Sequence, residues 1–305
     1  MRIKTSRISL VLMVLFVARG ATTLEAQSLK PVKITPEWNA KIAKLMPARP
    51  RVKPAATRRV LLFSLTTGFK HWTIPHIDRV IELLAEKTGA FEVTRSTDVA
   101  VFEREALKRF DAVILNNNCS KGPGRNLFID VLGDDRSRAA RLEKNIRDFV
   151  AGGKGLTAIH GAIVCFNNSP EFSDMLGGSF DFHPAQQKVT LDLVEPDHPL
   201  LKAFGGKPFV HIDEPYVFKN AYAKKNFRPL LAMDTSQLDC GNRQEQVASD
   251  VRYCAWIRKH GRGRVFYCSP SHNAQSLEDP RLLQFLLDGI QYALGDLICD
   301  DSVKR

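Results

Sequence analysis

The sequence contains none of the short motifs that identify a metal or redox site by spacing alone. It has no HExxH motif, and its six cysteines include no CxxC pair. These absences exclude a zinc-protease helix and a site built on paired cysteines. The sequence also has no internal repeat, which excludes an architecture of stacked repeats. Any reactive site must therefore be assembled from residues that are distant in the sequence.

A signature of nucleic-acid binding is also absent. The chain carries 44 Lys and Arg against 33 Asp and Glu, a formal net charge of +11. Much of this excess lies near the start of the chain and in residues 30–59, and no recognition motif or aromatic-interleaved basic stripe accompanies it. A solvated basic face accounts for the charge, so no nucleic-acid partner is expected.

The apolar run at the start of the chain, residues 8–18, is shorter than the ~18 residues that a membrane-spanning helix needs. It follows Arg2, Lys4 and Arg7 and precedes small residues that end at Ala26. This order is typical of a cleavable signal peptide, here residues 1–26. We therefore expect a periplasmic or extracellular protein with no stable membrane insertion after cleavage. No cysteine lies near the cleavage site, so a lipid anchor is not indicated.

Residues 27–57 differ in composition from the rest of the chain and are predicted to form an N-terminal strap. Thr35-Pro36-Glu37 is a typical helix start, and the prolines after residue 45 prevent the helix from continuing. Trp38, Ile42 and Leu45 have the spacing of one helical face, so we expect the strap to dock on the main domain.

Residues 58–297 begin with an alternation of strand and helix patterns. Strands are predicted at 60–65, 91–94, 111–115 and 155–159, and helices at 74–88, at 102–110 and from about 138 to 151. This alternation predicts a doubly wound, mostly parallel sheet with helices on both faces and right-handed crossovers. The polar segment Ser120–Arg138 is predicted to be a functional lid.

The second part of this domain is predicted to consist mainly of strands. They are expected at 188–194, 209–218 and 229–233, followed by a hairpin of 253–258 with 264–268. Asp279-Pro280 begins a last helix that Gly295 ends, and residues 298–305 form a tail.

The buried strand 155–159 ends at His160-Gly161, which makes His160 the first candidate for function. Ligands of open α/β sheets bind beyond the carboxyl ends of the strands, and glycine permits a sharp turn there. The alternative is a structural histidine that is satisfied by a backbone carbonyl.

Further histidines and acids lie at or just past the ends of predicted elements. They are His71, His183, Asp213, Glu214 and His272. Such a group could hold a metal through neutral imidazoles, or one histidine could act as a general base beside a carboxylate.

Six segments in the same order resemble the trehalose-utilisation ThuA-like family over residues 58–295. They are GFKHWTIP at 68–75, HGA at 160–162, GGSFDFHP at 177–184, DHP at 197–199, DEPY at 213–216 and GRGRVFY at 261–267. One departure is Ser271, where the family pattern has a glycine before the histidine.

The resemblance implies a flavodoxin-like fold similar to that of the class I glutamine amidotransferases, but not their chemistry. Those enzymes carry a nucleophilic cysteine at the elbow, where this chain has His160-Gly161 and its nearest cysteine is Cys165. We therefore expect no glutaminase activity.

The resemblance also implies work on oxidised sugars such as 3-keto-glycosides, because family members often accompany sugar oxidoreductases. On this hypothesis His160, His71 and Glu214 are catalytic and a small-molecule sugar is the substrate. Other residues are expected to have further roles: substrate binding by Trp72, Asp213, Tyr216 and Asn117, and metal binding by His160, His183 and His272, with a divalent metal as the candidate cofactor.

The competing hypothesis is a non-catalytic carbohydrate-binding or scaffold module. It would use Trp72, Phe69, Phe182 and Tyr216 as sugar-stacking aromatics, although such residues more often pack in cores. Either kind of protein could form a homodimer.

Cys254 and Cys268 are each seven residues from Gly261, the centre of the predicted hairpin. A symmetric pairing would set them opposite each other, within reach of a disulfide. The alternative is two buried thiols that pack as small apolar side chains.

Overall fold

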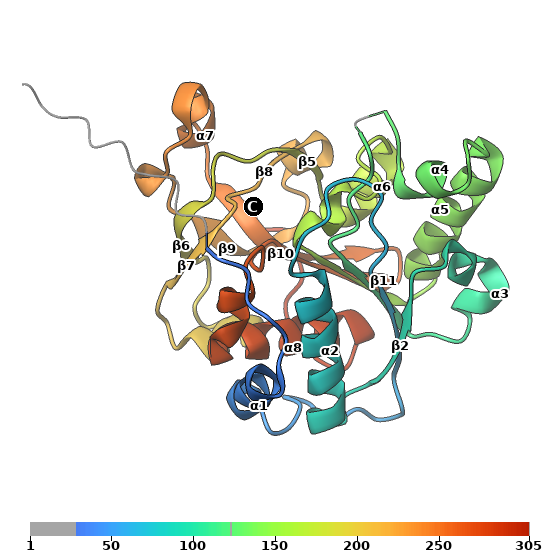
Figure 1. Cartoon of the computed structure of the whole chain (residues 1–305), viewed down its shortest axis with the longest axis horizontal. Helices are drawn as coiled ribbons and strands as arrows, with labels where there is room; N and C mark the ends of the chain where they lie inside the picture. The colour runs from blue at the N-terminus through green and yellow to red at the C-terminus, as the bar shows by residue number, and fades with distance from the viewer. Residues whose placement is uncertain (1–28, 123, 305) are drawn as a thin grey trace, which may run out of the picture.

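The computed structural model describes residues 29–122 and 124–304, so the predicted signal peptide lies outside the described residues. Its centre is a nine-stranded sheet in the order β2-β1-β3-β4-β11-β10-β9-β6-β7 (Figure 1). The strands of this sheet are β1 Arg59–Phe63, β2 Glu92–Ser96, β3 Ala112–Asn116, β4 Gly155–Ile159, β6 Gln187–Leu193, β7 Phe209–Asp213, β9 Arg228–Met233, β10 Arg252–His260 and β11 Gly263–Cys268. A small second sheet pairs β5 Ser179–Phe182 with β8 Val217–Lys219.

The main sheet has a parallel part and an antiparallel part that meet at β11. Strands β2, β1, β3, β4 and β11 run parallel to one another. From β11 onward, β10, β9, β6 and β7 pair in antiparallel fashion. The predicted doubly wound α/β fold is confirmed, and the C-terminal hairpin β10–β11 is built into the sheet directly beside the central strand β4.

Helices cover both faces of the sheet. They are α1 Pro36–Leu45, α2 Ile74–Thr88, α3 Arg104–Leu107, α4 Leu127–Val131, α5 Arg136–Ala151, α6 Pro170–Leu176, α7 Gln244–Ala248 and α8 Pro280–Leu294. Short 3-10 helices lie at Val99–Phe102, His160–Val164, Pro199–Phe204, Asn220–Lys224, Thr235–Gln237, Gly241–Arg243 and Ala274–Glu278. Figure 1 shows α1, α2 and α8 together at the bottom of the view and α3, α4 and α5 together at the right.

Two apolar cores correspond to the two faces. One joins α1, α2 and α8 to the sheet, and the other joins α3, α4, α5 and α6 to it. Along β1 the side chains alternate, so that Val60 and Leu62 belong to the first core and Leu61 and Phe63 to the second. Because successive side chains of a strand point to opposite faces, a strand that is buried on both faces is apolar throughout.

Local signals in the sequence located several elements closely. Helix α2 occupies 74–88 as predicted, and Gly89 ends it in the left-handed conformation with φ +63°. Strand β4 occupies 155–159 as predicted. The Ser169 hydroxyl caps α6, accepting from the Phe172 N–H, and Pro170 is its first residue.

The strap is packed on the domain, as predicted. Thr35 caps α1, and Trp38 and Ile42 are buried in the first core. Arg51 reaches the buried Asp288 of α8 with both a 2.8 Å and a 2.6 Å hydrogen bond. The strap is therefore part of the folded domain, because its apolar side chains pack in the core and its Arg51 pairs with a buried carboxylate.

The single strand predicted at 209–218 is wrong. The segment divides into β7 of the main sheet and β8 of the small sheet, and residues 214–216 lie between them. Pro215 has no N–H to continue a ladder, which explains the interruption. The break places Glu214 at the end of β7.

Two further predictions need correction. The helix predicted at 102–110 is a 3-10 helix that ends at Phe102 followed by the one-turn α3. The predicted lid, 120–138, is anchored to the domain by α4, which buries Leu127, Phe128 and Ile129. Burial of these three apolar side chains holds the segment on the second face.

The predicted opposition of Cys254 and Cys268 is also wrong. The hairpin turns through Gly261-Arg262, so His260 pairs with Gly263 and Cys268 faces Ala255. The register is thus shifted by one residue, and both thiols are buried and free. Among the helices of the described ranges, none combines the length and the hydropathy that a membrane crossing requires.

Candidate metal centre

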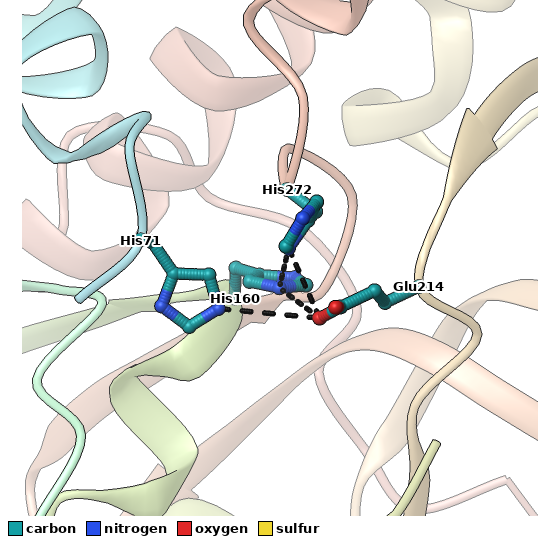
Figure 2. Close-up of side chains that lie close together, drawn as sticks. All are labelled: His71, His160, Glu214 and His272. Atoms are coloured by element: carbon teal, nitrogen blue, oxygen red, sulfur yellow. Dashed lines mark hydrogen bonds and ion pairs between the residues drawn. The ribbon is translucent and has the colours of Figure 1, made fainter. Parts of the chain in front are cut away.

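Three imidazoles and one carboxylate meet beyond the strand ends of the main sheet. One potential ligand atom from each of His71, His160, Glu214 and His272 lies within 4.8 Å of all the others. Figure 2 shows the Glu214 carboxylate directed at the three rings, which come from separate segments. The side chains are distant in sequence, so the fold alone brings them together.

Glu214 is the centre of the cluster. Its Oε2 lies 3.0 Å from His272 Nδ1, 3.4 Å from His160 Nε2 and 4.0 Å from His71 Nε2. Burial opposes ionisation of this carboxyl, but the hydrogen bonds with His160 and His272 outweigh it and lower the pKa of Glu214. Glu214 is therefore an anion at neutral pH.

The backbone fixes His160 at the sharp turn after β4. His160 has a positive φ of +48°, and its Nδ1 lies 2.7 Å from the Ser269 carbonyl oxygen. A carbonyl and a carboxylate both only accept, so Nδ1 donates to Ser269 and Nε2 donates to Glu214. Burial opposes the charged ring, but its acidic and carbonyl partners outweigh burial and raise the pKa of His160. The backbone contact predicted for a structural histidine is present, and a metal ion would take the place of the Nε2 proton.

Gly161 allows the cluster to close. A Cβ at this position would lie 2.8 Å from His71 Cε1 and 2.9 Å from Asn117 Oδ1. Asn117 is fully buried, and its Oδ1 accepts a 3.0 Å hydrogen bond from the Gly161 N–H. The predicted contact of Asn117 with substrate is therefore replaced by a role in positioning the turn.

His71 lies between β1 and α2 and is almost completely buried. Burial, followed by the neighbouring His160 and His272, lowers the pKa of His71 to about 2. Its Nε2 is 3.4 Å from the Tyr216 hydroxyl. A neutral imidazole is the form that a metal ion binds.

Asp213 supports two cluster members from behind. Its carboxylate accepts hydrogen bonds from the backbone N–H groups of Glu214 at 2.8 Å, Ser271 at 2.8 Å and His272 at 3.1 Å. With the residue only 2% exposed, these bonds leave it no access to a ligand. The predicted role of Asp213 in substrate binding is therefore corrected to positioning.

Ser271, the departure from the family pattern, is in a strained conformation. Its φ is +127°, and its buried hydroxyl has no hydrogen-bond partner among the described residues. Glycine adopts this backbone conformation at lower cost, which explains why the pattern has glycine here.

A cavity of about 250 Å³ opens beside the cluster. Its lining residues are Phe69, His71, Cys119, Ser120, Val164, Phe180, His183, Glu214 and Tyr216. Cluster and cavity therefore share His71 and Glu214, as a reactive centre beside a binding pocket requires.

His183 lies at the cavity and outside the four-residue cluster. Its Nε2 is 3.8 Å from Glu214 Oε1, and its side chain is 34% exposed. The metal-ligand set predicted from the sequence, His160, His183 and His272, thus shares two residues with the observed cluster. The sequence could not order the histidines by distance, because His183 follows β5 in the separate small sheet.

The aromatic residues proposed as sugar platforms divide into two groups. Phe69 and Tyr216 line the cavity. Trp72 instead packs against His76 at 5.2 Å between ring centroids, and Phe182 lies under the Arg243 guanidinium. The predicted substrate contact of Trp72 is not supported by this position. Phe180 and Cys119 line the cavity without any motif in the sequence that marks them.

The cysteines do not offer a nucleophile. Cys165 is buried directly after the 3-10 helix His160–Val164, and burial raises the pKa of its thiol well above the usual range. Burial likewise raises the pKa of Cys119 to about 12. Both groups are therefore thiols at neutral pH, and the nucleophile of thiol chemistry is the thiolate.

These features define an α/β protein with a doubly wound sheet whose strand ends carry a histidine–carboxylate cluster in place of a nucleophilic cysteine. The family model described as ThuA, trehalose utilisation, matches residues 59–293. The chain belongs to this family.

Solved structures support the same fold. A ThuA-like protein from Bacteroides uniformis is 18% identical with a TM-score of 0.60, covering 80% of this chain and 94% of its own. A ThuA-like protein from Parabacteroides merdae is 16% identical with a TM-score of 0.55, covering 78% and 90%. The cytoplasmic protein STM1381 of Salmonella typhimurium is 14% identical with a TM-score of 0.52, covering 77% and 99%. No protein with a curated description matches the chain.

Proposed function

We propose that this protein is a metal-dependent enzyme that cleaves an oxidised sugar, a 3-keto-glycoside or a related compound, outside the cytoplasm. The observation that supports this most strongly is the convergence of His71, His160, His272 and Glu214 beside a cavity (Figure 2). Membership of a trehalose-utilisation family supports a sugar as the substrate.

The cluster has the donor set of a transition-metal site. Three imidazole nitrogens and one carboxylate oxygen suit ions such as Zn²⁺, Fe²⁺ or Ni²⁺. Ligand bonds of about 2.1 Å place the ligand atoms of a tetrahedral site ~3.4 Å apart. Glu214 Oε2 lies 3.0, 3.4 and 4.0 Å from the nitrogens of His272, His160 and His71, so these atoms need to move only slightly. Behind the ligands, the Ser269 carbonyl orients His160 and Asp213 orients the backbone of His272; hydrogen bonds of this kind fix the direction of metal ligands.

His183 is suited to be the general base. Its Nδ1 lies 2.9 Å from the Pro184 carbonyl and donates to it, so its Nε2 lone pair faces the cavity side near Glu214. In this scheme His160 and His71 hold the metal, and the proton transfer expected of them from the sequence passes to His183.

The reaction begins with the hydrogen next to the keto group, which that group acidifies. His183 takes this C2 proton, the electron pair forms a C1=C2 double bond, and the C1–O bond breaks. The leaving oxygen takes a proton from Tyr216, whose pKa burial raises, so that it keeps its proton until then. Water then adds to the double bond: its hydroxyl joins C1, its proton returns to Tyr216, and His183 gives the C2 proton back, which completes hydrolysis. A bound divalent ion would act as a Lewis acid on the keto oxygen.

The experiment is an assay of purified mature protein with a 3-keto-glucoside, before and after metal removal by a chelator. We expect turnover that disappears with the metal and returns on reloading. Glu214→Gln removes one ligand charge with little change in shape and should lower turnover at least ~100-fold. The matched control His260→Gln changes a histidine at the far hairpin turn and should retain full activity. Chelator-resistant turnover, or full activity of Glu214→Gln, would overturn the proposal.

Export is part of this proposal and has its own readout. The predicted signal peptide, residues 1–26, should be removed on secretion. Protein recovered from the periplasm or medium should begin at Gln27, whereas an intact Met1 in a cytoplasmic fraction would contradict export.

A further inference from the structure

The cavity beside the cluster is lined largely by aromatic and aliphatic side chains. Phe69 packs edge-on against His71 with 4.7 Å between ring centroids. Phe180 contacts Tyr216 at 4.8 Å, and Tyr216 contacts His160 at 4.3 Å. An apolar surface therefore begins directly at the ligand cluster and extends into the cavity.

Most polar groups of the lining are already bonded to the protein. The Ser120 hydroxyl donates to the Val164 carbonyl, and the Cys119 thiol contacts the Gly161 carbonyl. Tyr216 OH lies 3.4 Å from His71 Nε2. His183 Nε2 and Glu214 Oε1 are the lining atoms best placed to bind a substrate hydroxyl.

This inventory argues against a second sugar ring in the cavity. A sugar residue brings several hydroxyl groups, and each one that loses water without gaining a partner costs about 1–3 kcal/mol. An apolar ring gains free energy from the same burial. The group that fills this space is thus expected to be apolar.

Phe69 is placed to contact such a group. It is 63% exposed, and it is the one aromatic residue among the exposed large hydrophobic side chains of the described ranges. Its turn is held firmly, because the N–H groups of Thr67 and Gly68 both bond the Cys119 carbonyl, at 3.0 and 2.9 Å. A Cβ at Gly68 would lie 2.1 Å from the Ser120 carbonyl oxygen, so the close approach requires glycine.

We propose that the cavity binds the aromatic aglycone of the substrate, so that the preferred substrate is an oxidised aryl glycoside and not an oligosaccharide. This inference rests on the proposed function. The oxidised ring lies at the cluster, and the aryl ring stacks on Phe69. When the C1–O bond breaks, the aryl oxygen leaves with a proton as a phenol. A phenol has a pKa near ~10, so it is a better leaving group than a sugar alcohol.

Two assays test the subsite. The first compares kcat/KM for phenyl 3-keto-glucoside and a 3-keto-disaccharide on the wild type, Phe69→Ala and Phe69→Trp. Wild type should favour the phenyl substrate at least tenfold. Phe69→Ala should reduce that preference about tenfold, mainly through KM, as loss of one ring stack predicts. Phe69→Trp should restore the preference for the phenyl substrate. The control Val131→Ala, at an exposed valine of α4, should leave kcat/KM for both substrates unchanged.

The second assay measures binding of unoxidised phenyl glucoside by calorimetry, which needs no turnover. Binding that Phe69→Ala weakens and Phe69→Trp restores supports the subsite even if no keto-glycoside is cleaved, in which case only the proposed function fails. Turnover of both keto substrates with equal kcat/KM, or a preference for the disaccharide, would overturn the subsite and leave the proposed function standing.

Discussion

The ligand cluster consists of two pairs of residues that the fold holds in different ways. His71 and His160 follow β1 and β4, and their rings are placed by tight packing around Gly161. Glu214 and His272 follow β7 and β11, and one carboxylate, Asp213, binds the backbone of both. The first pair therefore depends on shape, and the second pair depends on one buried charge.

The largest effect is expected where shape is decisive. Gly161→Ala would place a methyl group 2.8 Å from His71 and 3.0 Å from Cys119 Sγ. Forcing such a group into a packed region costs about 1–3 kcal/mol of unfolding free energy. The change should be seen in chemical denaturation, together with loss of bound metal. Gly122→Ala, which has open space around it and, like Gly161, no positive φ, is the control for adding a methyl group without a clash. Equal effects of the two would contradict the packing argument.

Asp213→Asn tests how Glu214 and His272 are held. The amide keeps the size of the side chain but removes the negative charge to which three backbone N–H groups donate. Its NH2 group also replaces an oxygen that accepted, so at least one of these hydrogen bonds is lost. We expect metal affinity to fall about 10–100-fold in a protein that remains folded, because groups that orient metal ligands by hydrogen bonds have effects of this size. Isothermal titration with Zn²⁺ measures it, and Asp192→Asn, on β6 and away from the cluster, is the matched control. Unchanged affinity would show that the backbone holds His272 without Asp213.

Ser271→Gly should change the free energy of unfolding by a smaller amount, and it should stabilise the protein. It relieves a strained backbone, with φ +127°, and removes a buried hydroxyl that lacks a partner among the described residues. Relief of both costs is partly offset by the entropy that glycine adds to the unfolded chain, which leaves an expected net gain of about 1 kcal/mol. We expect a higher melting temperature at unchanged metal stoichiometry. A lower melting temperature would mean that Ser271 is favourable where it stands.

The smallest effect concerns the strap. His76 of α2 lies between Trp38 and Trp72, and its Nε2 is 2.8 Å from the Val32 carbonyl. Burial lowers the pKa of His76 despite that hydrogen bond. The docked state therefore binds fewer protons than the undocked one, and docking weakens as the pH falls below the ordinary histidine pKa of ~6.5.

Limited proteolysis of residues 30–57 at pH 8 and pH 5 measures this effect. Wild type should be cut faster at pH 5 than at pH 8. For His76→Gln, the cleavage rates at the two pH values should differ less. A pH ratio that is the same in both proteins would exclude His76 as the cause.

The residues of the first pair are also the ones that the sequence predicts best. His160 was identifiable because an apolar five-residue strand followed by His-Gly has a known position at the edge of a parallel sheet. Helix α2 was located by its apolar spacing and by Gly89. These signals are local, so the residues around them contain the information.

The pair Glu214 and His272 and the positioning residues could not be located in this way. The break at Pro215 that separates β7 from β8 decides where Glu214 points, and it became apparent only from the pairing of the strands. The hairpin register depended on a single residue of the turn, which displaced the predicted partner of Cys268. The roles of Asp213 and Asn117 were likewise invisible, because a buried carboxylate or amide that binds backbone N–H groups has the same sequence signature as one that binds a ligand.

The central claim is that His71, His160, His272 and Glu214 together hold one divalent metal ion. The most direct test is elemental analysis of purified wild type and Glu214→Gln after exposure to a mixture of Zn²⁺, Fe²⁺, Mn²⁺ and Ni²⁺ and removal of loosely bound ions. We predict one transition-metal ion per wild-type chain and a substoichiometric amount in Glu214→Gln, with both proteins folded by circular dichroism. A wild type without metal, or equal occupancy in the two proteins, would contradict the claim.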